Sequence, residues 1–186
     1  MNDQLSDRAL IAALKEGDRG AFEELFRRNQ RLVYSVALNF FGGRRQAAED
    51  VTQQVFLKLY THAGKFRGDA KVSTWLYRIT VNLCIDEQKK RWRLPFLTDL
   101  FASGDAPPEA EGDSGVGDFE LEDEVRRAVG ELKPIFRLPI VLKHVEGMSY
   151  GEMAEILDCS EGTIASRLSR GHRQLAEKLK HLKDER

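Results

Sequence analysis

The 186-residue sequence has only two cysteines and four histidines, and it has no long apolar run. Its two cysteines, Cys84 and Cys159, lie in separate halves of the chain, so we expect both to be small buried hydrophobic residues. No apolar run is long enough to cross a bilayer, and the acidic, polar start does not look like a secretory signal. We therefore expect a cytoplasmic protein without a metal or other cofactor. The four histidines are scattered: His62, His144, His172 and His181.

Sequence signatures of enzymes are also missing. The triplet His144-Val145-Glu146 matches the His-x-Glu of zinc deaminases, but no Pro-Cys-x-x-Cys follows it. The Gly115-Val116-Gly117 triplet has neither the preceding strand nor the third glycine of a dinucleotide-binding loop. No phosphate-binding loop or nucleophile elbow is present, so an enzyme is the function class we expect least.

The net charge of −1 hides a strong asymmetry along the chain. Residues 95–124 contain ten acidic groups and no basic one, whereas the segments on either side carry a net positive charge. Prolines, glycines and like charges prevent this stretch from forming a packed core. We predict domains at 1–93 and 125–186, joined by a flexible acidic linker at 94–124. The linker either mimics nucleic acid in a basic channel or serves as an inert tether.

Hydrophobic periodicity predicts an all-α protein with two small helical domains. In the first domain, apolar residues recur at helical spacing from Leu10 to Leu14, from Phe22 through Phe26 to Phe40, and from Val51 to Leu59. Glycines 42 and 43 should end the second of these helices. We expect Ser73 to cap a fourth helix, whose core positions are Trp75, Leu76, Ile79 and Leu83.

The second domain has the pattern of a helix-turn-helix. Ser149 and Glu152 form a capping box, residues 158–160 form a turn, and a longer helix begins near Glu161. Pro139 should kink or break the preceding helix. The apolar stripe of the longer helix shares its face with Gly171 and consists of Ile164, Leu168, Leu175, Leu179 and Leu182.

The opposite face of that helix carries Ser166, Arg170 and Arg173, with Thr163 and Arg167 beside them. Arginine can grip a phosphate or a guanine edge with two hydrogen bonds, which favours DNA binding over a merely solvated helix.

A second basic face is predicted on the fourth helix of the first domain. Arg78, Asn82 and Lys89 recur on it, close to Phe66 and Trp75. Cations with nearby aromatic rings suit single-stranded or melted DNA, although Trp75 also fits a core position. On the third helix, Asp50, Gln53, Gln54 and Leu57 are left facing outward, which suits a protein partner.

Three ordered motifs of the sequence resemble the extracytoplasmic-function (ECF) RNA polymerase sigma factors. The segments 66–69 and 73–82 resemble their region 2, a helical bundle. The segments 146–154 and 158–170 resemble their region 4, a helix-turn-helix. The segment 50–56 resembles their core-polymerase-binding segment, and the resemblance covers nearly everything except the acidic linker.

The resemblance implies a sigma factor that binds RNA polymerase core and promoter DNA and is held by an anti-sigma factor in a stress or envelope response. It assigns core polymerase binding to Asp50, Gln53, Gln54, Phe56 and Leu57. It assigns the −10 element to Phe66, Arg67, Trp75, Arg78, Asn82, Lys89, Lys90 and Arg91. It assigns the −35 element to Ser160, Glu161, Thr163, Ser166, Arg167, Ser169, Arg170 and Arg173.

The sequence departs from the family at positions that bear on promoter choice. Ala165 and His172 stand where basic residues are usual, and Ser169 stands where the closest relatives have an aromatic residue. Two alternatives to a sigma factor remain at this point. One is a stand-alone helix-turn-helix regulator, which would usually dimerise on two half-sites. The other is an adaptor, which would show no salt-sensitive DNA binding.

Overall fold

A computed structural model describes residues 6–98 and 118–184, with the backbone alone for 92–98, 118–120 and 183–184. These residues form helices and no strand, which confirms the predicted all-α class. The first unit contains α1 (Asp7–Lys15), α2 (Arg19–Phe40), α3 (Arg45–His62), the short 3-10 helix η1 (Ala63–Lys65) and α4 (Val72–Thr98). The second contains α5 (Asp118–Gly130), α6 (Pro134–His144), α7 (Tyr150–Leu157), α8 (Glu161–Lys178) and α9 (His181–Asp184).

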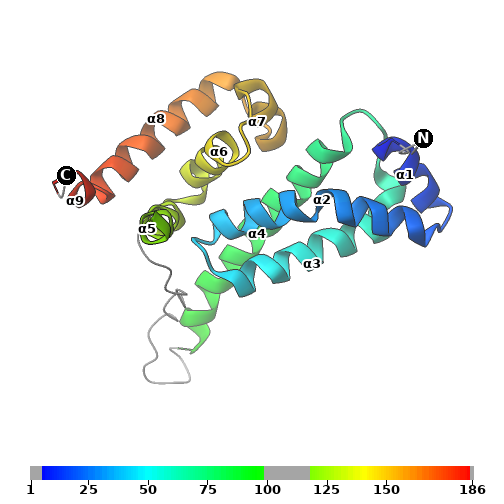
Figure 1. Cartoon of the computed structure of the whole chain (residues 1–186), viewed down its shortest axis with the longest axis horizontal. Coiled ribbons are helices and arrows are strands. Elements are labelled where there is room, and N and C mark those ends of the chain that lie inside the picture. The colour runs from blue at the N-terminus through cyan, green and yellow to red at the C-terminus, as the bar shows by residue number, and fades with distance from the viewer. Residues whose placement is uncertain (1–5, 99–117, 185–186) are drawn as a thin grey trace.

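In the first unit, α2, α3 and α4 pack against one another, with α1 at the far end of the bundle (Figure 1). Its core is apolar, and Leu25, Val33, Val55 and Leu59 are completely buried. The predicted stripes are therefore confirmed, with one difference. Phe26 is 37 % exposed, because its ring lies over the α2–α3 groove and packs on Phe56 instead of entering the core.

The helix ends of this unit follow local chemistry. The Asp18 side chain caps α2 by accepting a hydrogen bond from the Gly20 N–H at 2.8 Å. Gly42 and Gly43 end α2 with positive φ angles, as predicted. The prediction that Ser73 caps α4 is wrong, because the helix already begins at Val72 and the Trp75 N–H donates to the Lys71 carbonyl.

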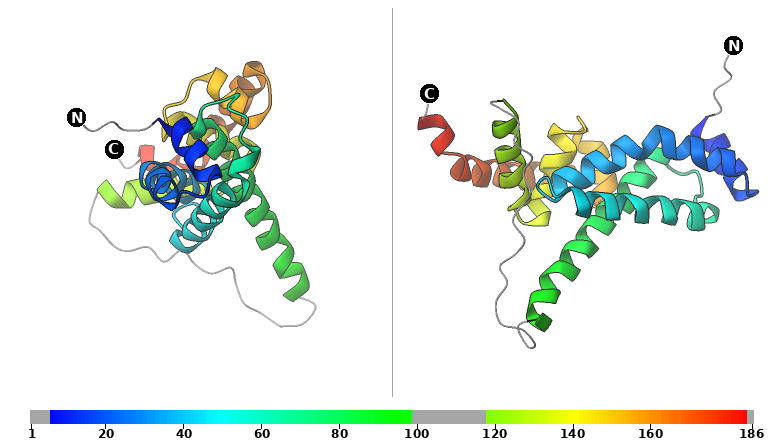
Figure 2. Two further views of the ribbon diagram at one scale, coloured as in Figure 1. Left: turned by 90° about the vertical axis from the view of Figure 1, so that its right-hand side faces the viewer. Right: turned by 60° about the horizontal axis from the view of Figure 1, so that its bottom comes forward.

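Helices α4 and α5 both extend into the stretch predicted as a linker. The last turns of α4 project beyond α2 and α3 and end at Thr98, and α5 begins at Asp118 (Figure 2). The intervening residues 99–117, which include Pro107 and Gly115, lie outside the described residues. The prediction of a flexible acidic linker therefore stays a prediction for that stretch.

In the second unit, α8 packs along α6 and α7. Helix α6 continues through Pro139, against the prediction of a break. The proline lies in the second turn and removes only the bond to the carbonyl of Ile135, so the rest of the ladder is intact. Gly171 lies so close to α6 that a Cβ added to it would meet Ile140 Cγ1 at 3.1 Å. The predicted close approach of two helices at Gly171 is thus present.

The two units share a seam formed by α2 and α4 on one side and α5, α6 and α7 on the other (Figure 1). At one end of the seam the backbones of Gly42 and Gly130 touch. A Cβ added to Gly130 would lie 2.7 Å from Gly42 Cα, so a side chain there requires the backbones to separate.

At the centre of the seam lies Arg137 of α6, which is 1 % exposed. Its guanidinium donates to the Phe40 carbonyl at 2.8 Å, to Gln88 Oε1 at 3.0 Å and to the Leu132 carbonyl at 3.1 Å. It also lies 4.7 Å from the centroid of the Phe40 ring. Burial, and secondarily the charge of Arg44, lower the pKa of Arg137 to about 10, so the group is still charged at neutral pH. Arg137 therefore ties α6 to α2 and α4 through neutral oxygens.

Two further expectations concern the cysteines and membrane spans. Cys84 is buried and burial raises the pKa of its thiol, whereas Cys159 is only half-buried, unlike its prediction. In the described part of the chain, no helix combines the length and the apolar content of a membrane span.

The contact between Gly171 and Ile140 generates a stability prediction. We expect Gly171→Val to lower the free energy of unfolding by about 1–3 kcal/mol, because the added branches overpack the α6–α8 contact. Urea unfolding of the full chain, followed by far-UV circular dichroism, measures this change. The matched control is Gly162→Val on the same helix, where an added Cβ meets only Ser160 Oγ, at 3.9 Å. An equal loss in both variants would contradict the packing argument.

Candidate functional site

The helix-turn-helix is fixed by caps at both of its helices. The Ser149 N–H donates to Glu152 Oε2 at 2.9 Å, and the Glu152 N–H donates to Ser149 Oγ at 3.3 Å. The Ser149 N–H and the Ser149 hydroxyl, the latter at 2.7 Å, both donate to Glu152 Oε2 and hold the pKa of Glu152 below its usual value. Asp158 ends α7 in the left-handed conformation with φ 48°, and Ser160 caps α8. The predicted capping box and three-residue turn are confirmed.

The outer face of α8 is polar and accessible. Ser166, Ser169, Arg170 and Arg173 are exposed, and Glu161 is exposed at the start of the helix. Ile164 and Leu168 on the opposite face are buried against the rest of the domain. The predicted polar face therefore points outward as a unit.

The remaining predicted residues of α8 have partners within the domain. The Ser160 and Thr163 hydroxyl groups share a hydrogen bond of 2.9 Å. Arg167 is half-buried, and its Nη1 lies 3.6 Å from Cys159 Sγ in a weak hydrogen bond. The turn before α8 thus restrains both the start of the helix and its first arginine.

The basic face of α4 is present, although several of its charges are paired. Asn82, Lys89 and Lys90 are exposed, as is Arg67 in the loop before the helix. Lys89 and Lys90 lie near carboxylates one turn back, at N···O distances of 3.8 and 3.7 Å. Such exposed pairs contribute little stability, so little free energy is lost when they separate. The face therefore remains available to an anionic partner.

The aromatic residues beside this face belong mostly to the core. Phe66 is 8 % exposed and packs on the half-buried Trp75, with ring centroids 5.3 Å apart. The Phe66 carbonyl accepts a hydrogen bond from Lys15 Nζ at 2.9 Å. Phe66 therefore supports the loop before α4 and offers little surface to a base, whereas Trp75 is only partly buried.

The outer face of α3 combines polar and apolar groups. Gln53 is exposed, Asp50 and Gln54 are half-buried, and Leu57 is 61 % exposed. Phe56 is 3 % exposed beneath Phe26, with ring centroids 4.5 Å apart. Phe56 therefore lies under the face predicted to bind a partner and not on it.

An aromatic surface that the sequence reasoning missed continues this face. Phe26 of α2 and Tyr60 of α3 are 37 % and 48 % exposed, like Leu57 of α3. The half-buried Phe22 joins them, since its centroid is 5.4 Å from that of Tyr60. The signal in the sequence was the i, i+4 spacing of aromatic residues on two helices, of which Phe22 and Phe26 were interpreted as core and Tyr60 was not considered.

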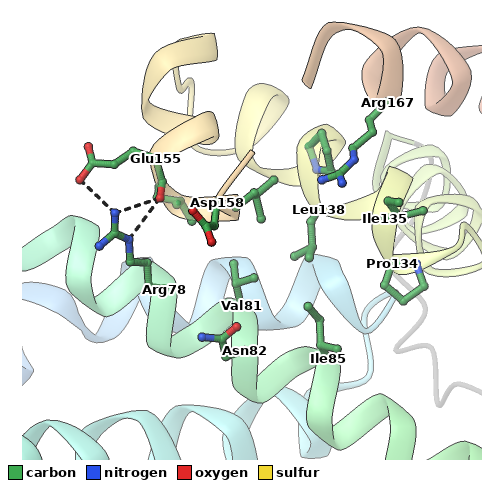
Figure 3. A pocket seen from close by; sticks show the side chains of 13 residues that line it. Arg78, Val81, Asn82, Ile85, Pro134, Ile135, Leu138, Glu155, Asp158 and Arg167 are labelled. Carbon is green, nitrogen blue, oxygen red and sulfur yellow. Dashed lines mark hydrogen bonds and ion pairs between the residues drawn. The ribbon is translucent and has the colours of Figure 1, made fainter. Parts of the chain in front are cut away.

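A cleft of about 690 Å³ lies between the two units and is lined by residues of α4, α6, α7 and α8. Arg78 and Asn82 of α4 line one side, and Arg167 of α8 lines the opposite side (Figure 3). Residues predicted to bind two different DNA elements therefore meet in one cleft. Its floor is apolar and includes Val81, Ile85, Leu138 and Ile156.

Comparisons with known proteins agree with this architecture. The family model Sigma-70 region 2 matches residues 25–94, and Sigma-70, region 4 matches residues 122–175. The ECF RNA polymerase sigma-E factor of Escherichia coli is 33% identical over 193 residues, covering 98% of each chain. The RNA polymerase sigma-H factor of Pseudomonas aeruginosa is 33% identical over 192 residues, with the same coverage. The chain belongs to the ECF sigma factor family.

Solved structures with the same fold are sigma factors in complexes. RpoE in complex with the anti-sigma factor NepR from Bartonella quintana has a TM-score of 0.66 and 25% identity, over 86% of this chain and 96% of that one. CnrH in complex with the cytosolic domain of CnrY has the same TM-score and identity, over 94% and 97%. The family contains transcription initiation factors, so the chain is not an enzyme.

The sigma-factor resemblance gave no indication of the contact between His144 of α6 and His172 of α8. Their Nε2 atoms are 2.8 Å apart, so one ring donates to the other. Burial, followed by the nearby His172 and Lys143, lowers the pKa of His144. Among the described residues, no group of three or more histidine, cysteine or acidic side chains is arranged to hold a metal ion.

The capping box generates a prediction for the helix-turn-helix of this sigma factor. Ser149→Ala removes the side-chain acceptor for the Glu152 N–H and should lower the free energy of unfolding by about 1 kcal/mol. Urea unfolding, together with hydrogen exchange of the α7 amides, measures the loss. Ser73→Ala is the control, because Ser73 lies inside α4 and does not cap it. If the two variants lost the same stability, the capping account would not hold.

Proposed function

We propose that this sigma factor binds the RNA polymerase core through its first domain and directs initiation at promoters that both of its domains contact. The observation that carries the proposal is the presence, in one chain, of three separate surfaces. They are the α3 face around Leu57, the basic face of α4 and the outer face of α8. A stand-alone regulator needs only the last of these.

We assign the residues by surface. Core polymerase binding belongs to Asp50, Gln53, Gln54 and Leu57, with Phe26 and Tyr60 as an apolar extension and Phe56 as support beneath it. Contacts to the −10 element belong to Arg67, Trp75, Arg78, Asn82, Lys89, Lys90 and Arg91, with Phe66 supporting the loop. Contacts to the −35 element belong to Ser160, Glu161, Thr163, Ser166, Arg167, Ser169, Arg170 and Arg173.

The chemistry of these groups fits their tasks. An amide such as that of Asn82 can donate and accept, which suits the Watson–Crick edge of an unstacked base. Exposed arginines on α8 can reach phosphates and guanine edges in the major groove. Because Ala165, Ser169 and His172 replace the residues usual in the family, the promoter preference of the relatives is not carried over to this chain.

The domain boundaries belong to the proposal as well. We assign residues 1–93 to region 2, 94–124 to the acidic linker and 125–186 to region 4. The matches of the two family models at 25–94 and 122–175 support this division. We further assign the protein to the cytoplasm, where polymerase and promoter DNA are found.

An anti-sigma factor is the second partner that we propose, in control of a stress or envelope response. Its support is the pair of structural neighbours, which are sigma factors bound to the anti-sigma factor NepR or to the cytosolic domain of CnrY. Binding over the α3 face would exclude the polymerase.

Run-off transcription with purified polymerase core on a pool of random promoters tests whether the protein directs initiation. The same assay tests the proposed DNA contact of Arg170. Protein-dependent start sites are the expected result. On a promoter selected this way, Arg170→Ala should lower initiation about tenfold, since a base or phosphate contact is worth roughly 1–3 kcal/mol. Lys180→Ala, an exposed cation near the end of the domain, is the control. Salt-sensitive DNA binding without any protein-dependent initiation would favour a stand-alone regulator instead.

Core binding gives a prediction that needs no DNA. The double variant Gln53→Ala and Gln54→Ala should weaken the affinity for polymerase core about tenfold or more without changing stability, because both amides lie in the proposed interface. Titration of a labelled chain with core enzyme measures the affinity. Arg31→Ala is the control, since Arg31 is exposed on α2 at about 140° around the helix from Phe26. Normal affinity in the double variant would remove the assignment of this face.

A further inference from the structure

A pair of histidines joins α6 to α8 on the surface of the second domain. The Nε2 atoms of His144 and His172 are 2.8 Å apart, and the centroids of the two rings are 5.0 Å apart. Both side chains are exposed, so an ion in solution can reach them. A hydrogen bond between two imidazole rings has one donor and one acceptor, so at least one of these nitrogens carries a lone pair directed at the other ring.

The packing of the two helices holds the rings in place. His144 follows Ile140 by one turn of α6, and His172 follows Gly171 directly on α8. Gly171 is buried against α6, where a Cβ added to it would meet Ile140 Cγ1 at 3.1 Å. The close approach of the helices at Gly171 therefore sets the separation of the histidines. Two ligands that are already held together lose less conformational entropy when they bind an ion.

The separation of the two nitrogens fits a ligand pair of a transition metal ion. Imidazole nitrogens bind such ions at about 2.0–2.1 Å, so two of them are about 2.9 Å apart at a right angle and about 3.3 Å apart at the tetrahedral angle. The 2.8 Å between the Nε2 atoms matches the right angle. That angle is typical of tetragonal Cu²⁺ and Ni²⁺ sites, whereas Zn²⁺ is usually tetrahedral.

We propose that His144 and His172 form a surface site for a divalent transition metal ion, with Cu²⁺ bound most tightly. The ion takes the place of the shared proton, which moves through water to Nδ1 of the same ring, and both rings bind through Nε2. Water fills the other positions, because in the part of the chain that the structure describes no third histidine, cysteine or acidic side chain is arranged with the pair. The preference for Cu²⁺ follows from the angle and from the general order of affinities among these ions.

The position of the site on α8 gives it a consequence for DNA, which rests on the proposed function. His172 lies one turn after Ser169 and directly before Arg173, two exposed residues that we assign to the −35 element. A bound ion adds two positive charges there, and a phosphate oxygen can replace one of its waters. Metal binding therefore strengthens the contact of region 4 with the DNA backbone.

Calorimetric titration of the untagged full chain with CuCl₂, NiCl₂ or ZnCl₂ tests the site itself. We expect Cu²⁺ to bind more tightly than Ni²⁺ or Zn²⁺. His144→Ala and His172→Ala should each weaken Cu²⁺ binding more than tenfold, because each removes a ligand and even the loss of an outer-shell partner costs 10–100-fold. The control is His62→Ala in the first domain, where the Nδ1 atom of His62 is hydrogen-bonded to Thr61. Circular dichroism verifies that each variant retains its helices.

Electron paramagnetic resonance of the bound Cu²⁺ identifies its ligands. The parent chain should show coupling to two imidazole nitrogens, and His144→Ala should lose one of them. Equal Cu²⁺ affinity in the parent and both site variants, or coupling to a single nitrogen in the parent, would overturn the site. His144 and His172 would then be a hydrogen-bonded pair only.

The consequence for DNA is measured by run-off transcription with the holoenzyme, on a promoter selected without added metal. The ion used is Ni²⁺, at a concentration that saturates the parent chain but not His144→Ala. This variant keeps every proposed DNA contact, because His144 lies on α6. Added Ni²⁺ should raise initiation by the parent about tenfold more than initiation by His144→Ala, as expected for one good DNA contact.

An equal response of the two chains to Ni²⁺ would overturn the consequence for DNA. Failure of the parent to initiate without added metal would instead overturn the proposed function, and calorimetry would still report whether the two histidines bind the ion.

Discussion

The guanidinium of Arg137 is a cation buried between the two domains, and oxygen atoms of both domains accept its hydrogen bonds. Moving such a charge out of water is costly unless hydrogen bonds surround it, and here the bonds come from Phe40, Gln88 and Leu132. The last carbonyl of α2, an amide in the middle of α4 and the α5–α6 turn must therefore converge on one point. The register of α6 against the first domain follows from this requirement.

The polar contacts of Arg137 lie within an apolar contact between the domains, because the buried hydrophobic residues of both domains form one cluster. Glu146 and Arg78 form further hydrogen bonds across the seam, and the cleft beside Arg78 has an apolar floor.

Much of the fold could be predicted because it depends on short-range patterns. The capping box at Ser149, the turn at residues 158–160 and the glycines that end α2 are all local signals, and the structure contains each of them. Predictions failed where a distant partner decides the outcome. Phe26 has the spacing of a core residue, but Phe56 and the α2–α3 groove place it at the surface. Nothing near Arg137, Glu146 or His144 in the sequence points to partners that lie tens of residues away.

The backbone contact between Gly42 and Gly130 has a consequence for the evolution of this protein. The two backbones already touch, so any residue larger than glycine at Gly130 separates them, and none brings them closer. Random substitution at Gly130 therefore acts in one direction only, toward looser association of the domains. A lineage that needed tighter association would have to find it elsewhere along the seam, whereas a lineage that needed less restraint could reach it in a single mutational step.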